Sequence, residues 1–153
     1  MLDFLEDERV LGEWRRYGGL EALFSYGVSV CDAMAGTGFD RTRLDFEKRL
    51  PESHLKFLMD TKLSWQVGDY FFCHAGVRPD VPLEQQRPED LLWIREPFLS
   101  SSRSFGKIVV HGHTPSEGVE SLHNRINVDT GAYATGALTC VVLDGATRRF
   151  LST

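Results

Sequence analysis

Residues 63–74 read Leu63-Ser-Trp-Gln-Val-Gly-Asp-Tyr-Phe-Phe-Cys-His74, with two apolar runs on either side of a Gly-Asp pair. Two short runs of aromatic and β-branched residues joined by a glycine turn are typical of a β-hairpin. The second run ends at His74, where the small residues Ala75 and Gly76 follow. The stretch therefore predicts a sheet from whose edge a histidine emerges.

Helices precede this hairpin. From residue 1 to about residue 26 the apolar side chains recur at roughly helical spacing, which predicts two or three short helices. Gly18 and Gly19 should break the first pair, and Gly27 should end the next helix as a C-cap. A further helix is expected from Pro51 onward, because proline is tolerated in a first helical turn.

Strands dominate the remainder. After a short helix over residues 88–94, apolar runs predict strands at residues 107–111, 119–122, 125–128, 137–143 and 147–151. Helices followed by a hairpin-rich sheet indicate an α/β or α+β arrangement of layers. The sequence has no internal repeat or low-complexity segment, so we expect one domain over residues 1–153.

The composition argues against several functions. A hydrophobic content of 42% allows a real core, and the net charge of −5 gives no basic surface, so we expect no nucleic-acid partner. Without an apolar run of about 18 residues or a signal-peptide pattern, we expect a cytoplasmic protein and no membrane partner. Cys31, Cys73 and Cys140 lack Cys-x-x-Cys spacing and are expected to be small core residues.

A second histidine motif is Val109-Val-His-Gly-His-Thr-Pro115, an apolar strand that runs into a glycine turn. Imidazole suits first-row divalent metals as a ligand. Gly112 allows the turn to rotate His113 away from His111, so these two histidines need not bind one metal together. A single histidine at a strand end is more often structural, so neither histidine motif is specific by itself.

Arg95 lies between the two histidine motifs, in Leu91-Leu-Trp-Ile-Arg-Glu-Pro97. It follows an apolar helix end, and its planar guanidinium matches two oxygens of a phosphate. For a lone arginine, the alternative is a surface salt bridge with Glu96 or another acid.

The order of four segments is more informative than any one of them: His-Ala-Gly-Val, Leu-Leu-Trp-Ile-Arg-Glu, His-Gly-His-Thr-Pro and Asn-Val-Asp-Thr-Gly-Ala. In this order they resemble the phosphoprotein phosphatases of the calcineurin-like metallophosphoesterase superfamily, in their bacterial and lambda-phage-like branch. The resemblance covers nearly the whole chain after about residue 50. It implies the C-terminal part of one metallophosphoesterase domain, a layered β-sandwich with a mixed β-sheet flanked by helices. It also implies serine/threonine protein phosphatase activity.

The resemblance also implies roles for individual residues. His74 and His113 match two ligands of the second metal, and Arg95 matches the catalytic arginine that binds the substrate phosphate. His111 is expected to pack or to support the ligands rather than to bind metal. Asp129 is expected either to orient a ligand histidine or to cap a turn beside Gly131.

The family's three upstream motifs, Gly-Asp-x-His-Gly, Gly-Asp-x-x-Asp-Arg-Gly and Gly-Asn-His-Glu, are absent from these 153 residues. In the complete domain, two divalent ions (manganese, iron or zinc) would activate a bridging hydroxide that attacks the phosphorus of a phosphoprotein or phosphopeptide. Alone, the chain should bind one metal weakly at most and show no activity. It should also self-associate or need the missing segment.

Three alternatives are open at this point. Asp129-Thr-Gly-Ala132 also matches retroviral-type aspartic proteases, but these place the motif before a glycine-rich flap, and only about 20 residues follow it here. A remnant domain that binds metal weakly or another polypeptide is a non-enzymatic alternative. A hydrolase of phosphodiesters or dinucleoside polyphosphates from the same superfamily is the third.

Overall fold

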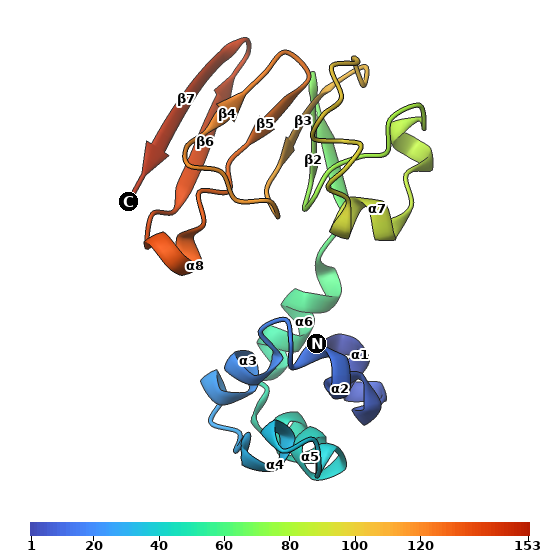
Figure 1. Ribbon diagram of the computed structural model, residues 1–153, viewed down its shortest axis with the longest axis vertical. Coiled ribbons are helices and arrows are strands. Elements are labelled where there is room, and N and C mark those ends of the chain that lie inside the picture. The colour runs from blue at the N-terminus through green and yellow to red at the C-terminus, as the bar shows by residue number, and fades with distance from the viewer. The chain divides into compact units, whose positions relative to one another are not determined.

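The computed structural model describes residues 1–153 and shows a mixed α/β protein (Figure 1). The chain forms two compact units, Met1–Thr61 and Lys62–Thr153, which are described separately. The prediction that both belong to one domain stays a prediction. None of the helices has the length and apolar character that a membrane crossing requires.

The first unit is helical. It consists of α1 (Leu2–Glu6), η1 (Glu8–Val10), α2 (Leu11–Trp14), α3 (Gly19–Ser25), α4 (Cys31–Met34), α5 (Phe39–Arg49) and α6 (Glu52–Asp60). Its core is built around the fully buried rings of Phe4 and Phe46. Gly18 and Gly27 adopt positive φ values of 83° and 74°, next to the ends of α3, as their predicted roles require.

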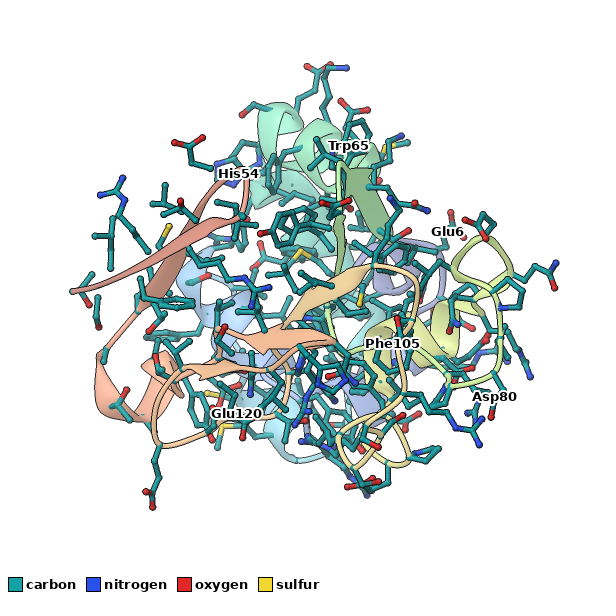
Figure 2. The ribbon with its side chains drawn as sticks, turned by 90° about the horizontal axis from the view of Figure 1, so that it is seen from above. Glu6, His54, Trp65, Asp80, Phe105 and Glu120 are labelled. Carbon is teal, nitrogen blue, oxygen red and sulfur yellow. The ribbon has the colours of Figure 1, made fainter.

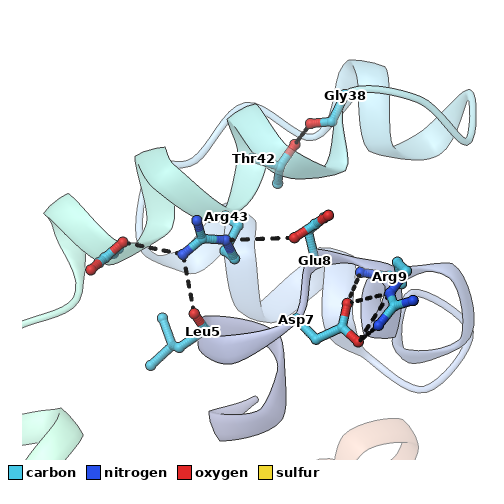
Figure 3. A network of polar contacts seen from close by, with 8 residues as sticks. Leu5, Asp7, Glu8, Arg9, Gly38, Thr42 and Arg43 are labelled. Carbon is cyan, nitrogen blue, oxygen red and sulfur yellow. Dashed lines mark hydrogen bonds and ion pairs between the residues drawn. The ribbon is translucent and has the colours of Figure 1, made fainter.

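The longest helix of this unit, α5, is not predicted from the sequence. Only Thr42 and Phe46, four residues apart, are buried along its 11 residues. Most of the remaining side chains are charged, and two ion pairs four residues apart stabilise the helix surface. Figure 3 shows Arg43 of α5 donating to the backbone carbonyl of Leu5 at 3.1 Å. A charged surface with so narrow an apolar stripe gives little periodic signal.

The second unit contains two sheets. The larger comprises β1 (Ser64–Val67), β2 (Tyr70–Cys73), β3 (Ile108–His111), β4 (Glu120–Ser121) and β5 (Arg125–Asn127). Its order is β1-β2-β3-β5-β4, and the smaller sheet pairs β6 (Thr139–Asp144) with β7 (Thr147–Ser152). The β1–β2 hairpin is antiparallel and confirms the predicted turn, whereas β2, β3 and β5 run parallel. The mixed sheet predicted from the sequence is confirmed.

The two faces of the larger sheet bury different clusters because side chains alternate along each strand. On one face, Phe71 and Val109 pack with Leu91 of α7 (Pro88–Trp93). On the other face, Val110 and Ile126 pack with apolar residues of β6. The short helices η2 (Leu83–Gln85) and α8 (Ala132–Thr135) complete the unit. The parallel strands are thus covered on both faces.

The prediction of three core cysteines is wrong for two of them, since Cys31 and Cys140 are exposed. Cys31 begins the four-residue helix α4, and Cys140 lies on the face of β6 opposite to its partly buried neighbours Val141 and Leu143. Cys73 is half-buried on β2, where burial raises the pKa of its thiol to about 12. Cys73 is therefore a protonated thiol, a poor metal ligand.

Candidate metal and phosphate site

The candidate site lies where three parallel strands end. β2 leads into His74, β3 into the turn with His113, and β5 into Asp129. Because β2, β3 and β5 run in the same direction, their carboxyl ends meet at one edge of the sheet. The backbone N–H of Gly112 donates to the carbonyl of His74 at 2.9 Å, which joins the two histidine segments beyond the strands.

His74 and His113 are brought together although 39 residues separate them. His74 Nε2 lies 3.1 Å from His113 Nδ1, and the two ring centroids are 4.9 Å apart. This distance confirms the prediction that the two imidazoles converge. His74 is exposed and His113 is partly buried, so the pair is accessible to a ligand from solvent.

The backbone at His113 is unusual for a residue with a side chain. His113 has a φ of 66°, a left-handed conformation that non-glycine residues rarely adopt. This conformation lets the turn after β3 direct His113 away from His111, as the glycine-containing turn predicted. A strained conformation of this kind costs on the order of 1–3 kcal/mol and is found mainly at functional sites.

The environment of His113 favours its neutral form. Burial lowers the pKa of His113, and electrostatic interactions with Arg95 and His74 lower it further. Asp129 and a backbone hydrogen bond to Trp93 act in the opposite direction but are weaker. A neutral imidazole can bind a metal, and a ligand histidine commonly donates its other ring N–H to a carbonyl.

Arg95 lies beside the histidine pair. Its Nη1 donates to Thr114 Oγ1 at 2.8 Å, and Thr114 directly follows His113. The ring of Trp93, which is 57% exposed, meets the His113 ring edge-on at a centroid distance of 5.6 Å. The three segments singled out from the sequence, those of His74, Arg95 and His113, therefore converge in space.

His111 and Asp129 have structural roles here. His111 is 2% exposed, its ring packs edge-on against Phe98, and its Nδ1 lies 3.1 Å from the carbonyl oxygen of Gly112. This is the packing role that the sequence allowed. Asp129 Oδ1 accepts from the backbone N–H of Gly131 at 3.0 Å, which is the turn-capping role.

A small pocket opens next to the histidines. It has a volume of about 230 Å³, and its polar lining includes His74, His113, Asp129, Thr130 and Thr139. No group of three or more His, Cys, Asp or Glu side chains is arranged to hold a metal ion. His74 and His113 thus converge at this edge without a third side chain of these types arranged to bind a metal with them.

Sequence reasoning missed two residues of the site. Thr114 and Asn127 both lie in segments that carry the family resemblance, but neither is assigned a role from the sequence. Asn127 is 2% exposed and its Nδ2 donates to the carbonyl of Thr114 at 2.9 Å. An asparagine directly between Ile126 and Val128, in a predicted strand, is the signal that could have identified it, because a buried amide needs hydrogen-bond partners.

We compared the chain with protein-family models and with curated proteins, and neither comparison gave a match.

Proposed function

We propose that the chain is the C-terminal part of a metal-dependent serine/threonine phosphoprotein phosphatase, which hydrolyses phosphomonoesters. The observation that carries this proposal is the separation of 3.1 Å between His74 Nε2 and His113 Nδ1 at the carboxyl edge of the sheet. Arg95 lies beside this pair through its contact with Thr114. The family resemblance assigns metal binding to the histidines and phosphate binding to the arginine.

The separation of the two nitrogens fits a shared metal ion. Two nitrogens bonded to one metal at about 2.1 Å, at angles of about 90° to 110°, are about 3.0–3.4 Å apart. The same separation suits an N–H···N hydrogen bond when no metal is bound. His74 and His113 could thus take up a metal with little rearrangement. Manganese, iron and zinc all suit imidazole ligands.

Bound divalent metals would supply Lewis acidity toward phosphate oxygens and would activate water. Arg95 would hold the phosphate through its guanidinium, which makes charge-assisted hydrogen bonds to paired oxygens. His113 would remain neutral, because burial and the proximity of Arg95 lower its pKa. Trp93 flanks the pair with an exposed aromatic surface.

An uncovered apolar surface supports a need for further polypeptide. Figure 2 labels Trp65 on β1. Trp65 and Val67 project from β1 on the same face as their partners on β2, Phe72 and Tyr70. β6 covers part of this face, but Trp65 and Val67 are 63% and 57% exposed. Exposed apolar patches commonly mark interaction surfaces. Under this proposal, a segment with the three upstream motifs supplies the remaining metal ligands.

Complementation tests the proposal. The chain is co-expressed with a segment that bears the three upstream motifs, and the purified complex is assayed with manganese on a chromogenic phosphomonoester. We expect metal-dependent turnover by the complex and none by the chain alone, because two imidazoles cannot hold two metals. The Arg95→Ala complex should lose about 2–4 kcal/mol of transition-state stabilisation, the amount typical when one hydrogen-bond donor directed at the transition state is removed.

Matched controls separate the outcomes. His113→Ala should abolish turnover, whereas His123→Ala, which removes an exposed histidine bonded to the Ser102 carbonyl, should not. Turnover of a dinucleoside tetraphosphate in preference to a phosphopeptide would favour the alternative hydrolase. A complex that forms but shows no turnover on any of these substrates would favour the remnant domain. Robust turnover by the chain alone, lost in His113→Ala, would contradict the need for a second segment.

A further inference from the structure

The hydroxyl of Thr114 contacts the side chain of Arg95. Arg95 is exposed, and its long side chain leaves the segment after α7 with several rotatable bonds. Its Nη1 donates to Thr114 Oγ1 at 2.8 Å, across 19 residues of sequence. An exposed hydrogen bond contributes little to folding stability. Its main effect here is to restrict the orientation of the guanidinium.

Hydrogen bonds to Gly112 and Asn127 hold the backbone of Thr114 in place. Its backbone N–H donates to the Gly112 carbonyl at 2.8 Å, and its carbonyl accepts from Asn127 Nδ2 at 2.9 Å. Asn127 belongs to β5 and is 2% exposed, so its amide is fixed by the sheet. Asn127 Oδ1 also accepts from the backbone N–H of Asp129 at 3.0 Å. A chain of hydrogen bonds therefore connects the buried strand to the exposed arginine.

The hydrogen bond from Arg95 Nη1 to Thr114 determines which N–H groups of Arg95 remain available to a ligand. A guanidinium presents five N–H groups in one plane. Thr114 engages Nη1, which leaves the Nε–H and Nη2–H pair on the side edge of the group. This pair is one of the two parallel donor pairs that bind phosphate or carboxylate oxygens in a bidentate manner.

We propose that Thr114 is a positioning residue, which orients Arg95 so that its Nε–H and Nη2–H edge receives the substrate phosphate, and that Asn127 fixes Thr114. This inference rests on the proposed phosphatase function and adds to it the residue that aligns the phosphate-binding group. It links the phosphate-binding Arg95 to the metal-binding His113, since Thr114, which contacts Arg95, directly follows His113 in the same turn.

Nuclear magnetic resonance of the Arg95 side chain in the 153-residue chain tests the placement. The guanidinium signals are assigned by their loss in Arg95→Lys. Thr114→Val removes the hydroxyl while keeping the side-chain shape, and Thr114→Ser keeps the hydroxyl. We expect slowed rotation and distinct Nη signals in the wild type and in Thr114→Ser, and a single averaged Nη signal in Thr114→Val. Unchanged Nη signals in Thr114→Val would overturn the inference.

A second measurement separates this inference from the proposed function. Inorganic phosphate is titrated, in the presence of zinc, into the complex that each variant forms with the segment bearing the three upstream motifs. Loss of one orienting hydrogen bond should raise the phosphate Kd by about three- to tenfold in Thr114→Val and by less than about twofold in Thr114→Ser. Equal phosphate affinity in all variants would overturn the positioning role. A wild type that binds no phosphate would count against the proposed function, while the guanidinium signals would still decide whether Thr114 holds Arg95. Thr114→Ala, which also lacks the hydroxyl, replaces Thr114→Val if that variant does not fold.

Discussion

Two arginines in different parts of the molecule are used in opposite ways. In the helical unit, Arg43 is largely buried, donates to the Leu5 carbonyl at 3.1 Å and lies 3.4 Å from Glu47 (Figure 3). At the carboxyl edge of the sheet, Arg95 is exposed and bonded to the hydroxyl of Thr114. The first arginine joins helices, and the second presents donors to solvent. Polar groups at the sheet edge are open to solvent, whereas those in the helical unit bond to one another.

The difference follows from the secondary structure that carries each group. Helix surfaces bring residues three or four positions apart together, and such pairs satisfy one another locally. Parallel strand ends instead bring together residues far apart in the sequence, as with His74 and His113, and leave them beside open space. Four predictions test this contrast, from the largest effect to the smallest.

The packing beneath the sheet edge should be the most sensitive feature. In Gly76→Ala, the new Cβ would lie 2.3 Å from Phe98 Cδ1, at a φ of 155° that favours glycine. Overpacking and backbone strain together should lower the free energy of unfolding by about 4 kcal/mol, measured by urea denaturation. Gly118→Ala is the control, because nothing lies within 4 Å of its added Cβ. Equal stability of both variants would show that the edge is not held by this packing.

The buried His111 should make stability depend on pH. Burial lowers its pKa from 6.5 to about 4. Between these values the unfolded state binds more protons, so stability falls as the pH falls through this window. The full shift corresponds to about 3 kcal/mol, and the contribution is fully present above about pH 7. Unfolding free energies measured from pH 7 to pH 4 should be less pH-dependent in His111→Asn. An equal loss of unfolding free energy from pH 7 to pH 4 in the wild type and in His111→Asn would assign the effect to other groups. His54→Gln, in the helical unit, serves as a control.

Truncation of the two arginines should affect different properties. Arg43→Ala removes the donor to the Leu5 carbonyl and two ion pairs, and should cost about 1–2 kcal/mol of stability. Arg95→Ala should change stability by less than about 0.5 kcal/mol, because the side chain is exposed. Thermal and urea unfolding of both variants measure this difference. A large loss of stability in Arg95→Ala would show that Arg95 stabilises the fold, as Arg43 does.

The smallest effect is expected for a local pair on α5. Arg49 Nε lies 2.9 Å from Asp45 Oδ1, four residues away, and both side chains are partly exposed. A double-mutant cycle with Arg49→Ala and Asp45→Ala should give a coupling of about 0.3–0.5 kcal/mol that weakens in 1 M salt. A coupling above about 1 kcal/mol, independent of salt, would mean that helix-surface pairs matter more than the contrast above allows.

The sequence predicted the sheet better than the helices. The β1–β2 hairpin, α7 and the strands from β3 to β7 agree with the predicted segments, because alternation and glycine turns give a direct local signal. The charged helix α5 and the short helices α4 and α8 were missed. Their helical structure depends on local ion pairs and on capping turns, which apolar periodicity does not report.

The candidate site was predictable in its main residues and not in its connections. His74, Arg95 and His113 each lie one or two residues beyond the end of a strand or helix, so their convergence followed from the expected topology. The links through Thr114 and Asn127 were not predictable, since a hydroxyl and an amide become partners only once a turn and a strand are in register. The choice between packing and a supporting role for His111 depended on burial, which no spacing in the sequence reveals.

The parallel pairing of β2 with β3 has a consequence for how the molecule folds. These strands are joined through α7, so a long chain segment must be closed before they pair. The chain therefore loses conformational entropy before the contacts between the strands form. The two histidines, 39 residues apart, can meet only after this closure. In a refolding experiment, the capacity to bind zinc should therefore appear with the slowest structural phase and not with early helix formation. Zinc binding by the histidine pair would then report when pairing of the parallel strands is complete.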